Sequence, residues 1–131
     1  AAGPYLDAAN DPEYPGLCFR MGFSLVVFFR NPRSIPGGVP ETVQKRAAIA
    51  AVIIADAGLQ HRTVQAAGSQ PANSTMIPTI GRLHGVRAAG LEHQGKLLEA
   101  LDAVRTARAI FDAPAQALRE VRVLLALDRV E

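Results

Sequence analysis

The strongest constraint on the fold of this chain is a helical periodicity between residues 96 and 111. Apolar side chains recur there on one face of a helix, and charged side chains occupy the opposite face. The apolar face comprises Leu97, Ala100, Leu101, Val104, Ala107 and Phe111. Arg105 and Arg108 lie near the C-terminal end, where cations interact favourably with the helix dipole. The pattern predicts an amphipathic helix at 96–111, with Leu101 and Val104 in the core.

Two further segments predict helices. Residues 41–57 are apolar nearly all round, and Pro40 before them suits a first helical turn. We therefore expect the helix at 41–57 to be buried and central. Residues 115–130 predict a last helix whose inward side chains are Leu118, Val121 and Leu125, with the aliphatic carbons of Arg122 as a further candidate. A strand at 121–127 is the alternative for that segment, because apolar residues also alternate there.

Residues 17–29 predict a long strand. Apolar side chains occupy every odd position, which is the period of a half-buried strand: Leu17, Phe19, Met21, Phe23, Leu25, Val27 and Phe29. Gly22 suggests a bulge in this strand. The strand needs a partner, either at 59–67 or 82–89 within the chain, or on another molecule by edge addition. We expect the isolated chain to be soluble but prone to associate through that edge.

These patterns predict a helix-dominated α+β class, with one long N-terminal strand and C-terminal repeat-like helices. The length of 131 residues suits a single domain. Its parts are an irregular Pro- and Gly-rich arm at 1–16, a strand and buried helix at 17–58, and a helical part at 81–129. Loops are expected at 31–40 and at 68–78.

Composition argues against several functional classes. The net charge is +2, the basic residues are scattered, and aromatic residues make up 5% without a Trp, so nothing clearly indicates nucleic-acid binding. The longest strongly apolar uncharged runs, at 21–29 and 47–55, have nine residues each and are too short to span a bilayer. A single cysteine, Cys18, excludes an intrachain disulfide framework and a multi-cysteine zinc site. The sequence does not indicate a compartment.

The C-terminal half resembles a tetratricopeptide repeat, a 34-residue helical hairpin. Leu91, Gly95, Ala100 and Ala107 stand where that motif has a large residue, the glycine between the helices and two small residues. Positions 84, 87 and 91 recur 34 residues later as Leu118, Val121 and Leu125. His84, Arg87 and Asp112 depart from the motif, and the resemblance covers about 81–127. It implies a stack of helices that binds other proteins.

No constellation in the sequence predicts catalytic residues, a metal site or a cofactor. Gly37 and Gly38 precede a helix and lie near Arg33, so their backbone N–H groups are candidates for binding an anion. His61, Arg62 and His84 are the other ligand-binding candidates. They would lie on the sheet if the chain folded as a βαββαβ unit, with strands near 17–29, 59–67, 82–89 and 121–127.

The sequence favours two functions. The first is a non-catalytic protein-interaction or assembly subunit, whose partner is another protein or a second copy of the chain in a homo-oligomer. The N-terminal arm and strand would then engage the partner. The alternative is a small ligand-binding or enzyme subunit of the βαββαβ type, so the sequence leaves enzymatic activity open.

Overall fold

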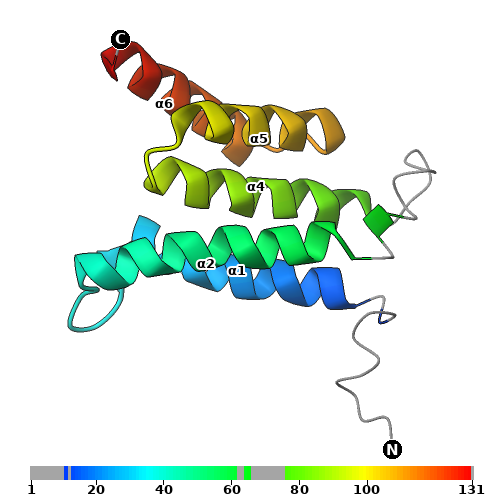
Figure 1. Cartoon of the computed structure of the whole chain (residues 1–131), viewed down its shortest axis with the longest axis horizontal. Coiled ribbons are helices and arrows are strands. Elements are labelled where there is room, and N and C mark those ends of the chain that lie inside the picture. Colours follow the sequence, from blue (N-terminus) through cyan, green and yellow to red (C-terminus); the bar gives the residue numbers. More distant parts are fainter. Residues whose placement is uncertain (1–10, 12, 62–63, 66–75, 131) are drawn as a thin grey trace, which may run out of the picture.

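The computed structural model describes residues 11, 13–61, 64–65 and 76–130, and every regular element within them is helical. In chain order the elements are α1 (Tyr14–Arg30), the 3-10 helix η2 (Pro32–Ser34), α2 (Glu41–Leu59), α4 (Ile77–His93), α5 (Leu97–Ile110) and α6 (Pro114–Val130). Figure 1 shows a stack of helices in which α4 lies between the α1–α2 pair and the α5–α6 pair.

The predicted α+β class is wrong for the described residues, which form an all-α structure. The expected strand at 17–29 lies within the helix α1. The four-strand alternative fails for the same reason: 82–89 lies in α4, 121–127 lies in α6, and the described part of 59–67 contains no strand. Edge addition by an N-terminal strand is therefore excluded as a mode of binding for this segment.

Helix α1 forms because residues 17–29 also carry the helical period. The buried side of α1 comprises Pro15, Cys18, Gly22, Val26 and Phe29, which recur at helical spacing. A run this apolar satisfies both periods, and packing decides between them. Gly22 is a point of close helix contact rather than a bulge, because a Cβ there would lie 2.7 Å from Cγ1 of Val86 on α4.

Helix α4, rather than the helix at 41–57, is the central element. Nine of its residues are buried: Ile80, Gly81, Leu83, Gly85, Val86, Ala88, Ala89, Gly90 and Leu91. Val86 and Ala89 join a core cluster with α1 and α2, whereas Ala88 and Leu91 join a second cluster with α5 and α6. The predicted helix at 41–57 is present as α2, but Ile49 and Ile53 on it are exposed.

The predicted helix at 96–111 is confirmed as α5, which forms a hairpin with α4. Val104 is fully buried, and Leu101 is partly exposed at the edge of the second cluster. Gly95 makes the turn at a φ of 80°, and the N–H of Lys96 donates to the carbonyl of Leu91 at 3.0 Å. The hairpin matches the expected helix order, and its assignment to the tetratricopeptide family stays a prediction.

The last helix is also present, but its predicted inward face is wrong. Leu118, Val121 and Leu125 are 69%, 55% and 54% exposed, and Val123 is the residue that is fully buried. Ion pairs explain this rotation, because Arg119 and Arg122 on α6 reach Glu92 of α4. The basic side of α6 therefore faces the stack, and its best apolar stripe faces solvent.

Candidate functional site

A hollow runs along the stack where α1 and α6 both border α4, and we call it the α1–α6 groove. It encloses about 240 Å³. Phe19, Phe23 and Val26 of α1 line one side, and Gln116 and Arg119 of α6 line the other. The remaining lining residues lie on α4, just before α6 or in its first turn, and they are Arg82, Gly85, Val86, Ala89, Ala113 and Ala115.

The groove is apolar because its base consists of small or aliphatic residues on α4. Gly85, Val86 and Ala89 are buried there, so the helix backbone lies close to the surface of the hollow. Phe23 on the α1 side is 55% exposed. A large exposed aromatic ring beside a hollow of small residues is the usual composition of a site that receives another apolar side chain.

The groove has two cationic side chains, one on α4 and one on α6. The guanidinium of Arg82 lies 5.7 Å from the centroid of the Phe19 ring, a cation–π distance. Arg119 donates from Nη1 to Oε1 of Gln116 at 3.1 Å and to the carbonyl of Gly85 at 3.4 Å. The bond to Gly85 ties the Arg119 side chain to α4, and the bond to Gln116 orients it along α6.

Arg119 also belongs to an ion cluster centred on Glu92 of α4. Arg122 donates to both carboxylate oxygens of Glu92, from Nε at 2.5 Å and from Nη2 at 3.0 Å. Arg30 at the end of α1 lies 3.5 Å from Glu92, and Arg119 Nε lies 3.6 Å from it. We call these four residues the Glu92 cluster. They join α1, α4 and α6 at one end of the groove.

The electrostatics of the cluster reflect its burial. The pKa of Arg119 is lowered to about 10, chiefly by burial; the charge of Glu92 opposes the lowering, and the charges of Arg30 and Arg122 add to it. Burial also lowers the pKa of Arg30, and the charge of Arg122 adds to that effect. The pKa of Arg122 is raised, first by its hydrogen bonds to Glu92. All three arginines nevertheless remain cationic at neutral pH.

The groove and the cluster are continuous because α1, α4 and α6 run in the same direction. Phe19 contacts Arg82 near the start of α1, and Phe29 meets His93 near its end at 4.8 Å between ring centroids. Glu92 follows Ala89 by three positions on α4, and Arg122 follows Arg119 by three on α6. Residues three or four apart lie on one helix face, so the groove extends by one turn into the cluster.

The structure does not bring the site residues predicted from sequence together. Arg33 lies in η2, where it lines a hollow of about 410 Å³ with Arg30, Asn31, Pro32 and Ser34. Gly37 and Gly38 are exposed, with φ of 83° and 74°, in the loop that leads into α2. His61 follows the far end of α2, a helix of 19 residues, so about 28 Å of helix separates it from that loop.

The two described histidines among those candidates have separate surroundings. His61 is buried and stacks on the ring of Tyr14, with the centroids 5.0 Å apart. His84 lies in α4, where burial first, and then the charge of Arg87, lower its pKa. Arg62 lies outside the described residues. Their roles as ligand-binding residues stay predictions.

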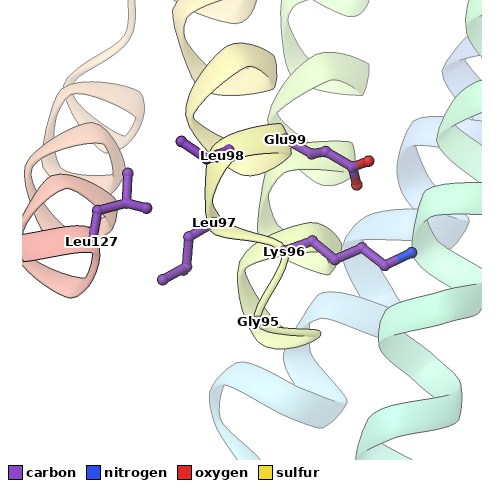
Figure 2. A pocket seen from close by; sticks show the side chains of 6 residues that line it. All are labelled: Gly95, Lys96, Leu97, Leu98, Glu99 and Leu127. Atoms are coloured by element: carbon purple, nitrogen blue, oxygen red, sulfur yellow. The ribbon is translucent and has the colours of Figure 1, made fainter. Parts of the chain in front are cut away.

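A further hollow of about 410 Å³ lies between the start of α5 and the end of α6, lined by Gly95, Lys96, Leu97, Leu98, Glu99 and Leu127. In Figure 2, Leu97 and Leu127 face one another from α5 and α6, whereas Lys96 and Glu99 point to the other side. Because the Lys96 and Glu99 side chains point away from Leu97 and Leu127, the hollow lacks the convergent polar groups of a specific site.

Sequence reasoning missed the residues that make the groove. Phe19 and Phe23 were placed on one face of a strand, and Arg119, Arg122 and Glu92 were separated by up to 30 positions in the sequence. The available signal was the pair of arginines three apart on α6, which lie on one helix face beside the stripe that the sequence predicts to point inward. Only the packing of α6 on α4 shows which carboxylate they meet.

In the described part of the chain, no group of His, Cys, Asp and Glu side chains is placed to bind a metal ion. None of the described helices is long and apolar enough to cross a membrane, as the two nine-residue runs in the sequence predict. Comparison with protein-family models, curated proteins and solved structures finds no match to this chain.

Proposed function

We propose that this chain is a non-catalytic protein-interaction subunit that binds an apolar side chain of a partner protein in the α1–α6 groove. The observation that carries this proposal is the exposed ring of Phe23 beside a base of Gly85 and Ala89. Anchor residues at protein interfaces enter apolar pockets of this kind, and neighbouring contacts then exclude water.

The size of the groove favours a protein segment over a small molecule. Sites for drug-sized ligands usually enclose about 300–1,000 Å³. The groove encloses about 240 Å³, which is room for about one or two large apolar side chains. A partner that inserts one anchor residue and lies along α1 and α6 fits this volume.

The polar lining favours binding over catalysis. Arg82 and Arg119 are the titratable side chains that line the groove. A guanidinium binds anions but does not exchange protons at neutral pH, so neither side chain can act as a general base. The groove therefore supplies an apolar anchor site and positive charge.

A pair of matched variants tests this proposal. Peptides selected from a displayed random library on the wild-type chain should bind the Phe23→Ser variant at least about tenfold more weakly, a loss of about 1.4 kcal/mol. The control is Ile53→Ser, which removes a similarly exposed apolar side chain on α2, 62% exposed, outside the groove. Selected peptides that bind both variants and the wild type equally would exclude the groove as the binding site.

The outer face of α6 supports a second candidate function, self-assembly with another copy of the chain. Leu118, Val121 and Leu125 are exposed at spacings of three and four, which is the spacing of a coiled-coil seam. A seam of this kind is self-complementary, because two copies related by a two-fold axis bury the same residues. The strand edge expected from sequence is absent from α1, so this face replaces it as the candidate for homo-oligomer formation.

Sedimentation tests the second candidate directly. The wild-type chain should associate at high micromolar concentration, and Val121→Asp should sediment as a monomer, because a carboxylate in the seam would be desolvated on pairing. Ala109→Asp on the exposed side of α5 is the control and should associate like the wild type. A wild-type chain that remains monomeric would exclude this face as a self-association surface.

A further inference from the structure

Outside the Glu92 cluster, the ion pairs between described residues are balanced. Among the described residues, Arg87 pairs with Asp56, and Arg105 and Arg108 share Glu120 and Asp112. In the Glu92 cluster, three guanidinium groups face a single carboxylate. Two positive charges therefore lack a matching negative charge among the residues that the structure describes.

The excess charge lies in a partly buried place. The side chains of Arg119 and Glu92 are only 13% and 15% exposed. Arg119 Nε is fully buried and has no hydrogen-bond acceptor in the described part of the chain. Cations that have lost water and have too few acceptors destabilise a folded protein, and a further anion would relieve the repulsion among them.

The cluster continues the groove, so one ligand can reach both. Arg30 follows Val26 by four positions on α1, and Arg122 follows Arg119 by three on α6. Arg30 and Arg122 keep 33% and 40% of their side chains exposed, so their outer N–H groups face incoming ligands. At the opposite end of the groove, Arg82 is exposed beside Phe19. Positive charge therefore borders the apolar hollow at both ends.

We infer that the segment bound in the groove is an acidic amphipathic segment of a partner protein. This inference rests on the proposed function and specifies its partner. An apolar anchor enters the hollow, one carboxylate joins Arg30 and Arg122, and another pairs with Arg82. Arg122 binds Glu92 through Nε and Nη2, and its remaining exposed N–H groups, with those of Arg30, can still donate to one further carboxylate. The apolar hollow beside them requires that the same ligand also carry an apolar side chain.

The outer face of α6 does not provide this segment. Arg122 and Arg129 border its apolar stripe on one side. Because arginines border the groove at both ends, covering it with that face of another copy would place like charges close together in either orientation, which disfavours pairing. The groove therefore selects a partner other than α6 of a second copy.

Three synthetic peptides of about 15 residues test the inference, each crosslinked to fix its helix. They share one leucine stripe at helical spacing and carry Glu, Gln or Lys at the remaining positions. Fluorescence anisotropy with the full chain should give an affinity for the Glu peptide at least about tenfold above that for the Gln peptide, with the Lys peptide weakest. Raising the salt from about 50 to about 500 mM should reduce that preference.

Two arginine variants locate the effect. Arg122→Gln and Arg82→Gln should each reduce the ratio of Glu-peptide to Gln-peptide affinity. Arg46→Gln, at an exposed arginine of α2, should leave the ratio unchanged. Thermal melts of all three variants confirm that each one is folded at the assay temperature.

The outcomes separate the inference from the proposed function. If the Glu and Gln peptides bind equally and Phe23→Ser weakens both, the groove binds a protein segment but the acidic partner is wrong. If no peptide binds, both proposals fail. If a single-stranded oligonucleotide displaces the Glu peptide at equal concentration, the arginines bind nucleic acid and the inference is also wrong.

Discussion

The substitution Gly90→Ala tests the packing of α4 most sharply, because sequence and structure predict opposite results. Gly90 lies inside α4, where the helix propensity of alanine favours the substitution by about 1 kcal/mol. In the structure, a Cβ at this position would lie 2.6 Å from the carbonyl oxygen of Ala48 and 2.7 Å from Cγ2 of Val52. The first neighbour is backbone of α2, which cannot rotate away.

The packing cost should exceed the gain in propensity. Overpacking of a close-packed core typically costs about 1–3 kcal/mol, and separating α2 from α4 would also disturb the fully buried Ala48 and Ala51. Because the closest clash is with backbone, the packing cost should lie in the upper part of that range, at about 2–3 kcal/mol. Subtracting the gain in propensity of about 1 kcal/mol leaves a net loss of about 1–2 kcal/mol in the free energy of unfolding. For a chain of 131 residues this corresponds to a fall in Tm of about 3–8 °C.

Urea denaturation followed by circular dichroism measures this difference, with Gly16→Ala as the matched control. Gly16 also lies in a helix, but a Cβ there meets nothing within 4 Å. Gly16→Ala should therefore raise the free energy of unfolding by up to about 1 kcal/mol. If Gly90→Ala were as stable as the wild type or more stable, α2 and α4 would not pack as closely as described.

Three further predictions follow from the described core. Leu83→Ala should lower the free energy of unfolding by about 2–5 kcal/mol in urea melts, because Leu83 is fully buried. Its control is Leu98→Ala, at a residue 73% exposed, which should lower the free energy of unfolding by under about 0.5 kcal/mol. Burial lowers the pKa of His84 in the folded chain below its ordinary 6.5, so the unfolded chain binds the proton more readily. The contribution of neutral His84 to the free energy of unfolding is therefore complete above pH 6.5 and is lost as pH falls through the lowered pKa of the folded chain. Urea melts at pH 7.5 and at lower pH should show this loss of stability, and His84→Gln should reduce it. Cys18 is buried, and burial raises its pKa, so it should react with a thiol reagent much more slowly in buffer than in denaturing urea; equal rates would show that Cys18 is accessible in the folded chain.

The sequence predicted α5 well because one face of that helix is clearly apolar and the other is charged. Ala100, Val104 and Ala107 are buried as the pattern requires. Nothing in that segment competes with the helical period, and Gly95 supplies the left-handed turn before it. Local information alone was sufficient for this element.

The same reasoning failed for α1 because that segment has too few polar residues to distinguish the two periods. Leu17, Met21 and Phe23 are apolar but exposed, so alternation suggested a strand face that does not exist. The buried side of α1 includes Gly22, which a periodicity analysis does not count as apolar. Its role depends on contact with Val86, a residue 64 positions away in the sequence.

Helix α6 shows a second limit of local patterns. Its existence was predicted, but its apolar stripe at Leu118 and Val121 was assigned to the core. Long-range ion pairs to Glu92 determine which side of α6 faces α4, and no spacing within α6 contains that information. The groove depends on the same packing, so the candidate site could not be derived from the sequence.

A chemical-shift titration of the ¹⁵N-labelled chain with the crosslinked Glu peptide tests the central claim most directly. We expect the largest amide shifts along the groove, at Phe23, Gly85, Ala89 and Arg119. They should saturate at one peptide per chain and be lost in Phe23→Ser. Shifts concentrated on the outer faces of α2 or α5, or no saturable shifts at all, would contradict a partner-binding groove between α1 and α6.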